Sequence, residues 1–347
     1  MTKRALITGI TGQDGSYLAE YLLELGYEVF GLIRRSSVGP NFSNIKHIVD
    51  DLNLLDGDMT DADSLRRAVH DSNPNEVYNL AAQSFVPMSW TSPSYTNNVN
   101  FGGFIYLLEA VKVYNAVQRF TGDKGSKVYQ ASTSEMFGNT GVLEGDLRTN
   151  SISLNEDSLM RPRSPYGLSK LASHRLAQVY RESFGMFVCS GICFNHESPR
   201  RGEMFVTRKI TKAVAAIHVG KQDKLVLGDI HARRDWGFAG DYIRAMWLML
   251  QQSSPHDYVI GTGVTHSVED VVVEAFKAAA SLAGGNLSTP WYDYIKKDKK
   301  YIRPAEIFTL RADAIKARER LGWRPTVSFE ALIHMMVKHD LEQEGVI

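Results

Sequence analysis

The segment that decides the fold is residues 4–25, RALITGITGQDGSYLAEYLLEL. Its first five residues predict a short buried strand, and residues 16–25 have the apolar spacing of a helix. Between them, three glycines form a G-x-x-G-x-x-G turn. Strand, glycine turn and helix in this order are typical of a dinucleotide-binding fold, because the backbone can approach a pyrophosphate at the helix N-terminus. An ordinary tight turn is the alternative, but the place of the glycines favours a cofactor.

The rest of the chain continues an alternation of strands and helices. Strands are predicted near Leu6, Val29, Leu54, Val77, Val128 and Val188, and helices at residues 61–70, 99–113, 166–184, 207–219, 241–251, 268–282 and 329–341. Residues 284–300 are predicted to be a loop. The pattern predicts an α/β protein with a Rossmann-type, doubly wound parallel sheet and a smaller, discontinuous C-terminal α/β domain. We expect residues 1–194 to bind the dinucleotide and residues 195–347 mainly to bind the substrate, with about 230–265 returning to the first domain.

Composition limits the classes of partner. The chain has 347 residues, a net charge of zero and 44% hydrophobic residues. This balance indicates no general attraction to nucleic acid or membranes, and no apolar run is long enough to span a bilayer. Because the first strand begins at once, we expect no signal peptide and a cytoplasmic location. Cys189 and Cys193 share one face of a predicted strand, so we expect buried, unbonded thiols and no metal site.

The second strand indicates which cofactor binds. It ends in Arg34, Arg35, Ser36 and Ser37, where an NAD site usually has a carboxylate. Two guanidinium groups and two hydroxyls suit a 2′-phosphate, which predicts NADP. A basic loop at a subunit contact is the alternative, and both interpretations can hold together.

Two segments indicate the chemistry: residues 132–135 (STSE), at the end of an apolar run, and Tyr166-x-x-x-Lys170. Tyrosine and lysine four apart lie on one helix face, and the lysine charge is expected to favour the phenolate, which can accept a hydroxyl proton. Thr133 can complete a proton relay. Glu135 adds a second base, which suits an enzyme that oxidises a sugar and then eliminates water. A solvated helix face is the alternative for the Tyr–Lys pair alone.

Basic clusters mark the second half of the chain, at residues 196–202 (HESPRRG), 233–236 (RRDW) and 303–306 (RPAE). Scattered arginines suit an anionic small molecule such as a nucleotide diphosphate. Surface ion pairs with the equally numerous carboxylates are the alternative.

The chain resembles extended short-chain dehydrogenases/reductases and, among them, the GDP-mannose 4,6-dehydratase family. The matching strings run in order along nearly the whole chain: residues 8–17 (TGITGQDGSY), 34–37 (RRSS), 78–84 (YNLAAQS), 129–138 (YQASTSEMFG), 163–167 (RSPYG), 194–202 (FNHESPRRG), 205–210 (FVTRKI), 234–237 (RDWG) and 303–306 (RPAE). The loop at 139–160 is longer than the family usually has.

The resemblance implies a redox-neutral lyase that converts GDP-mannose to GDP-4-keto-6-deoxymannose and water by internal hydride transfer through tightly bound NADP. Tyr166 would take the C4 hydroxyl proton, Thr133 would hydrogen-bond the substrate, Lys170 would hold the nicotinamide ribose, and Glu135 would remove the C5 proton. Another GDP-sugar, such as a GDP-heptose, is the alternative substrate for a dehydratase, epimerase or reductase. A protein that binds NADP without turnover is a further alternative.

The resemblance also implies binding residues and a homodimer or homotetramer with residues 34–37 near the interface. The implied cofactor contacts are Gly9, Ile10, Thr11, Gly12, Gln13, Asp14, Arg34, Arg35, Ser36, Ser37, Asp58, Met59, Leu80, Ala81, Ala82, Gln83, Ser84, Tyr95, Lys170, His196 and Arg201. The implied substrate contacts are Ser84, Asn195, Lys209, Arg234, Arg303 and Glu306. Close packing at a strand end is the alternative for Ala81 and Ala82.

Overall fold

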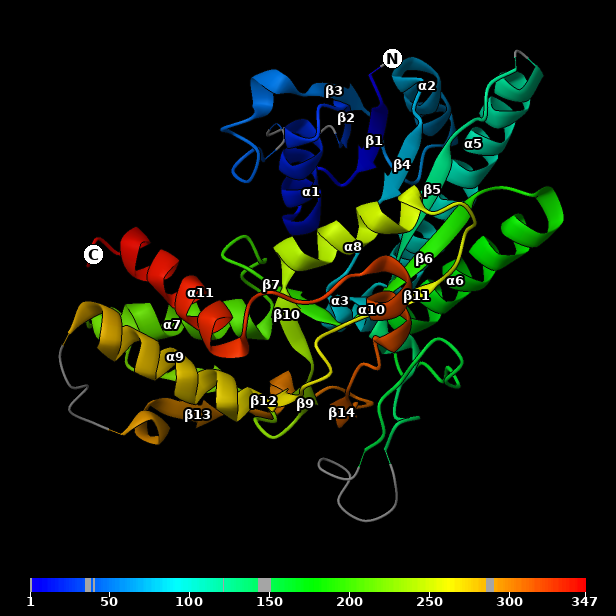
Figure 1. Cartoon of the computed structure of the whole chain (residues 1–347). Helices are drawn as coiled ribbons and strands as arrows, with labels where there is room; N and C mark the ends of the chain where they lie inside the picture. Colours follow the sequence, from blue (N-terminus) through cyan, green and yellow to red (C-terminus); the bar gives the residue numbers. More distant parts are fainter. Residues whose placement is uncertain (1, 35–38, 40, 121, 143–150, 285–289) are drawn as a thin grey trace.

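A seven-stranded parallel sheet forms the centre of the first of two lobes (Figure 1). The computed structural model describes residues 2–34, 39, 41–120, 122–142, 151–284 and 290–347. The strand order is β11-β6-β5-β4-β1-β2-β3. The strands are β1 (Arg4–Thr8), β2 (Glu28–Ile33), β3 (Asn53–Asp56), β4 (Glu76–Asn79), β5 (Lys127–Thr133), β6 (Val188–Cys193) and β11 (Tyr258–Ile260). The six strands predicted from the sequence are confirmed, and β11 adds a seventh from late in the chain.

Helices cover both faces of this sheet because its strands are apolar on both sides. Neighbouring residues such as Leu6 and Ile7 point into different apolar clusters. One cluster lies under α1 (Gln13–Glu24) and α8 (Ala239–Gln251), and the other lies under α2 (Ala62–Ser72), α5 (Gly103–Phe120) and α6 (Pro165–Phe184). The short helices α3 (Val86–Thr91) and α4 (Pro93–Asn97) and the π-helix Asn98–Gly102 lead into α5. The sheet is therefore doubly wound, as predicted.

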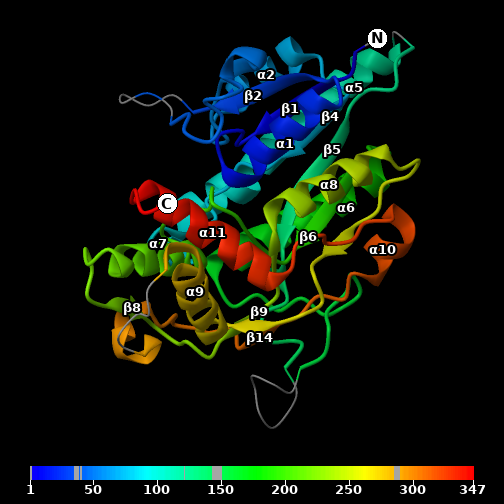
Figure 2. The same cartoon turned by 60° about the vertical axis from the view of Figure 1, so that its left-hand side comes forward.

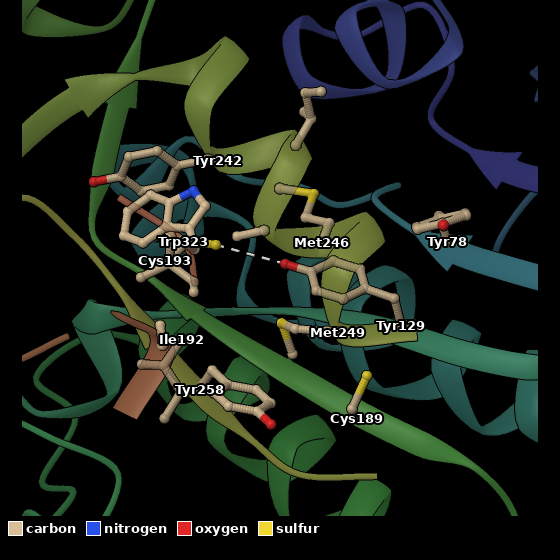
Figure 3. Close-up of a cluster of buried hydrophobic side chains, with 14 of the residues drawn as sticks. Tyr78, Tyr129, Cys189, Ile192, Cys193, Tyr242, Met246, Met249, Tyr258 and Trp323 are labelled. Carbon is tan, nitrogen blue, oxygen red and sulfur yellow. Dashed lines mark hydrogen bonds between the residues drawn. The ribbon is translucent and has the colours of Figure 1, made fainter. Parts of the chain in front are cut away.

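The core under α8 contains aromatic and sulfur-bearing side chains (Figure 3). The Tyr129 hydroxyl lies 3.5 Å from the Cys193 sulfur. Cys189 and Cys193 are both buried and free of disulfide bonds, as predicted. Trp323, from the C-terminal region, belongs to the same cluster.

A second lobe is built from α7 (Val206–His218), α9 (Val268–Ala283) and α11 (Phe329–Gln343), which share an apolar cluster (Figure 2). Short strands connect this lobe to the first: β7 (Asn195–Glu197) pairs with β10 (Trp236–Phe238), and β9 (Arg233–Arg234) lies between β12 (His266–Ser267) and β14 (Thr309–Leu310). Helix α10 (Ile315–Leu321) returns to contact β11 and α8.

The prediction of a plain loop over residues 284–300 is wrong for the part that is described. Strand β13 (Ile295–Lys297) pairs in parallel with β8 (Leu225–Leu227), and 3₁₀ turns Trp291–Tyr294 and Lys299–Tyr301 flank it. Ile295 packs against the apolar cluster of the second lobe. This long-range contact cannot be read from the charged local sequence. Within the described residues, none of the helices is both long and apolar enough to cross a membrane.

Candidate active site

A cavity of about 1070 Å³ runs from the carboxyl ends of the sheet strands to the second lobe. Open parallel sheets bind ligands at this edge, because the loops that follow the strands diverge there. Lining residues come from the turn after β1, from the ends of β4 and β5, from α6, and from β7 and the arginine-rich segments of the second lobe.

The glycine turn after β1 leaves no room for side chains. Gly9 has a φ of +73°, and a Cβ there would lie 2.9 Å from the backbone nitrogen of Ala81. A Cβ on Gly15 would lie 2.3 Å from the carbonyl oxygen of Gly9. Gly12 caps α1 without a side-chain hydrogen bond, so amide groups at this helix end are available to an anion.

Ile10 is the one described residue among the predicted contacts that does not line the cavity. Its side chain is fully buried and fills the space beside Gly31, where a Cβ would lie 2.4 Å from Ile10 Cδ1. The sequence did not show that the side chain of Ile10 points away from the cavity, because the glycine motif specifies the path of the backbone and not the direction of each side chain. The side chain of Ile10 therefore has a packing role, and the predicted cofactor contact at this residue stays a prediction for its backbone.

A partly buried ion pair connects the glycine turn to the second half of the chain. His196 Nε2 lies 2.8 Å from Asp14 Oδ2, and its Nδ1 lies 2.8 Å from the Phe194 carbonyl oxygen. Burial favours the neutral forms, but the charge of His196 and its hydrogen bond lower the pKa of Asp14 to about 2. For His196 the burial effect is likewise outweighed by Asp14, so its pKa is raised. Each group therefore favours the charged form of the other.

Another part of the cavity wall contains further residues that are predicted to contact the cofactor. Arg34 Nη1 donates to the Tyr95 hydroxyl at 3.0 Å. The Thr8 hydroxyl accepts from the amides of Leu80 and Ala81 at 3.1 Å each, which fixes the segment after β4. Lining residues here are Thr11, Asp58, Met59, Ala82, Gln83 and Ser84. Arg35, Ser36 and Ser37 lie outside the described residues.

Helix α6 presents Tyr166 and Lys170 to the end of β5. Lys170 Nζ donates to the Ala131 carbonyl at 2.9 Å. Burial raises the pKa of Tyr166 to about 12, although a hydrogen bond with Thr133 opposes the rise. Burial also lowers the pKa of Lys170 to about 8. The predicted lowering of the tyrosine pKa by the lysine charge is wrong in this ligand-free geometry, because desolvation dominates and the ammonium group turns to a carbonyl.

His174 continues the same face of α6, and sequence reasoning missed it. Its Nδ1 lies 3.2 Å from Ser132 Oγ, and burial lowers its pKa to about 4. Its position, four residues after Lys170, was the signal that would have placed it near β5. The sequence also gave Cys193 only a core role, although it lines the cavity beside Lys170.

Glu135 lies in the 3₁₀ turn Ser134–Met136 that follows β5. Its side chain is 9% exposed, and Oε1 accepts from Arg303 Nη1 at 3.1 Å. The other oxygen, Oε2, is buried and has no hydrogen-bond partner in the described part of the chain. Within that part, the carboxylate is thus held at one oxygen only.

The second lobe brings further cations to the same cavity. Arg234 donates to the carbonyls of Arg233 and Ile307 at 2.9 Å, and Nη2 lies 3.5 Å from Glu306 Oε1. Lys209 Nζ donates to the Val226 carbonyl at 2.6 Å and lies over the Tyr301 ring. Asn195 and Arg201 line the cavity as well. The tyrosine, lysine and glutamate predicted to carry the chemistry and the basic side chains predicted to bind an anion thus line one cavity.

Comparison with known proteins agrees with this arrangement. A model of the family described as GDP-mannose 4,6 dehydratase matches residues 6–336. The GDP-mannose 4,6 dehydratase 1 of Arabidopsis thaliana is 50% identical over 348 residues, covering 98% of this chain and 90% of that protein. The GDP-mannose 4,6 dehydratase of Homo sapiens is 42% identical, covering 97% and 91%.

Solved structures show the same fold with nucleotide ligands. A UDP-glucose 4-epimerase of Thermus thermophilus in complex with NAD has a TM-score of 0.80 at 26% identity, covering 99% of this chain and 100% of that one. The dTDP-glucose 4,6-dehydratase DesIV of Streptomyces venezuelae, with NAD and TYD bound, has a TM-score of 0.80 at 25% identity, covering 99% and 98%. From the family match and the full-length relatives, the chain belongs to the GDP-mannose 4,6-dehydratase family.

Proposed function

We propose that this lyase converts GDP-mannose to GDP-4-keto-6-deoxymannose and water, with NADP as a resident cofactor. The observation that carries the proposal is the presence of Tyr166 and Glu135 in one cavity with a glycine cradle. One residue suits oxidation of a hydroxyl and the other suits elimination. An epimerase or reductase has no evident use for the second carboxylate.

The residues present fit a nicotinamide dinucleotide, because close packing at Gly9 and Gly15 holds the turn tightly against the sheet, and Gly12 leaves the amide groups at the start of α1 open to a pyrophosphate. We infer that the residues holding it are Gly9, Thr11, Gly12, Gln13, Asp14, Asp58, Met59, Leu80 to Ser84, Tyr95, Lys170, His196 and Arg201. A bound nicotinamide supplies a site that takes up and returns a hydride. Arg34 supports the choice of NADP through its exposed guanidinium at the end of β2.

The chain's own residues move the protons. We infer that Tyr166 takes the proton of the C4 hydroxyl, while Thr133 hydrogen-bonds the same oxygen. The free oxygen of Glu135 then removes the C5 proton and passes it to the C6 hydroxyl, which leaves as water. Asn195, Lys209, Arg234, Arg303, Glu306 and Ser84 would hold the GDP-sugar.

The same proposal extends to domains, assembly and location. We infer that residues 1–194, together with α8 and β11, bind the dinucleotide and that the second lobe binds the GDP-sugar. Exposed apolar side chains on α5 and α6, such as Val113, Val117 and Val179, support a homo-oligomer. Two free buried thiols support a cytoplasmic location.

The test is to incubate the purified protein with GDP-mannose without added reductant and to record the product mass. Loss of one water with no net consumption of a cofactor is the expected result. Unchanged GDP-mannose with a protein that carries its dinucleotide would overturn the choice of substrate. Turnover that requires a stoichiometric reductant would instead indicate a reductase.

A further inference from the structure

Four charged side chains meet where the end of β5 faces the second lobe. Arg303 pairs with Glu135, and Arg234 pairs with Glu306. All four line the cavity. The electrostatic influence of each guanidinium reaches both carboxylates. The two arginines and two carboxylates of this cluster cancel in charge. A ligand with two negative charges that binds there must therefore take an arginine from its carboxylate partner.

The two arginines are held very differently. Arg234 donates to two backbone carbonyls in addition to its carboxylate, which fixes its guanidinium within the second lobe. For Arg303, the one hydrogen bond seen within the described residues is its contact with Glu135. Arg303 also lies in an irregular segment between Tyr301 and Thr309, and its side chain is 28% exposed. Arg303 is therefore the guanidinium that can change partner with the smaller structural change.

The contact with Arg303 also restricts Glu135. A guanidinium that donates to Oε1 fixes the position and orientation of the carboxylate. The second oxygen of Glu135 is buried, has no hydrogen-bond partner among the described residues and belongs to a side chain that lines the cavity. Such an orphaned oxygen is unusual in a protein and indicates a place for a ligand atom.

We propose that Arg303 is a positioning residue that restrains Glu135 in the substrate-free enzyme and releases it when it binds the diphosphate of the nucleotide sugar. This inference rests on the proposed function, because a diphosphate-bearing substrate is required. A diphosphate offers a guanidinium two charged acceptors in bidentate geometry, which outcompetes the single contact with Glu135. Once Arg303 has moved to the diphosphate, the carboxylate of Glu135 is free to turn towards the sugar at the moment when substrate is present.

The proposal couples binding of a diphosphate to loss of the contact between Arg303 and Glu135, and this coupling can be measured by binding alone, without turnover. If Arg303 must leave Glu135 in order to bind a diphosphate, then the neutral Glu135→Gln variant removes the competitor. GDP should bind this variant at least about fivefold more tightly than the unchanged protein. The gain should vanish in the Arg303→Gln background, and guanosine, which has no phosphate, should show no gain. Calorimetric titration of the four proteins with GDP completes the double-mutant cycle.

Glu306→Gln is the matched control, because it removes an equal charge from the same cluster without freeing Arg303. Its effect on GDP binding should depend on Arg303 much less than the effect of Glu135→Gln does, because Glu306 makes no hydrogen bond with Arg303 among the described residues. The proposal is overturned if Glu135→Gln leaves GDP affinity unchanged, or if its gain persists without Arg303, which would indicate a general charge effect. Failure of GDP to bind the unchanged protein would overturn the proposed function itself, whereas the two former outcomes would leave that function standing.

Discussion

At the scale of the residue, the ionisation of Tyr166 is set by burial more than by its sequence neighbour. Lys170 lies one turn away, yet its ammonium group donates to the Ala131 carbonyl. The pKa of Tyr166 is about 12 and that of Lys170 is about 8, and burial is the main cause of both. The spacing of the two residues was readable from the sequence, whereas their charge states required the depth at which the fold places them.

Tyr166→Phe should lower kcat by about 10²- to 10⁴-fold, because the group that accepts the C4 hydroxyl proton is removed. The aromatic ring keeps its packing, so the thermal stability should change little. Tyr292→Phe, at an exposed site, is the matched control and should retain full activity. Near-normal turnover by Tyr166→Phe, measured as dehydrated product per unit time, would remove this role from the tyrosine.

Glu135→Gln should block elimination more strongly than oxidation at C4, because its carboxylate is the proposed acceptor for the C5 proton. Quenching a single turnover with borodeuteride and locating deuterium at C4 of an undehydrated sugar would detect the ketone. Glu344→Gln, which removes a surface ion pair with Lys221, serves as the control and should dehydrate normally. Water loss at the parent rate in Glu135→Gln would show that another group is the base.

At the scale of the element, α6 and β5 meet along three consecutive strand residues. Lys170 contacts the carbonyl of Ala131, His174 contacts Ser132, and Tyr166 contacts Thr133. The sequence predicted both elements from their periodicity. It did not predict the register between them, because that register depends on side chains from distant parts of the chain.

Gly167→Ala should weaken this junction. A Cβ at residue 167 would lie 2.9 Å from the Glu135 carbonyl oxygen and 3.1 Å from Pro162 Cβ, so the first turn of α6 must shift. We expect a loss of about 1–3 kcal/mol in unfolding free energy and a larger fractional loss of kcat than of GDP affinity. Gly102→Ala, where an added Cβ meets nothing within 4 Å, is the control. Equal activities for the two variants would contradict the prediction.

Stability should depend on pH through His174. Its pKa is lowered to about 4 by burial, from an ordinary value near 6.5. Between these values the unfolded chain binds a proton that the folded protein does not, so stability is complete above pH 6.5 and falls as the pH drops towards 4. The loss from this one group should reach about 3 kcal/mol.

Chemical denaturation at several pH values measures this effect. His174→Gln should flatten the stability curve between pH 6.5 and 4, whereas replacement of the exposed His70 by Gln should leave its slope unchanged. An unchanged slope in His174→Gln would mean that other groups cause the acid loss.

At the scale of the whole molecule, the parallel sheet was predictable and the connections across the cleft were not. Strands buried on both faces, such as β1 and β5, are short apolar runs that the sequence displays directly. Pairings such as β9 with β12 and β14 involve two residues each and no periodicity. The arginines were predicted to gather around an anion, but the pairing of Arg303 with Glu135 joins residues 168 positions apart and was not foreseen.

A fragment of residues 1–194 should fail to fold alone, although it contains six of the seven strands of the sheet. It lacks α8 and β11, so the sheet face that carries Tyr129 and Cys189 would be left open to water. Circular dichroism and dinucleotide binding of the isolated fragment, beside the full chain, test this. Cooperative unfolding of the fragment would show that the first lobe is autonomous.

The late segments α8, β11 and α10 return to the first lobe between excursions into the second, so the chain crosses the boundary of the cleft repeatedly. Two lobes joined by a single linker can open by a hinge motion. Several chain crossings between the lobes raise the free-energy cost of that motion. Entry and exit of ligands should therefore depend on side chains and short segments at the rim of the cavity. Binding and release of ligands then require only local movements. Single substitutions at the rim can therefore change the rates of binding and release without disturbing either apolar core.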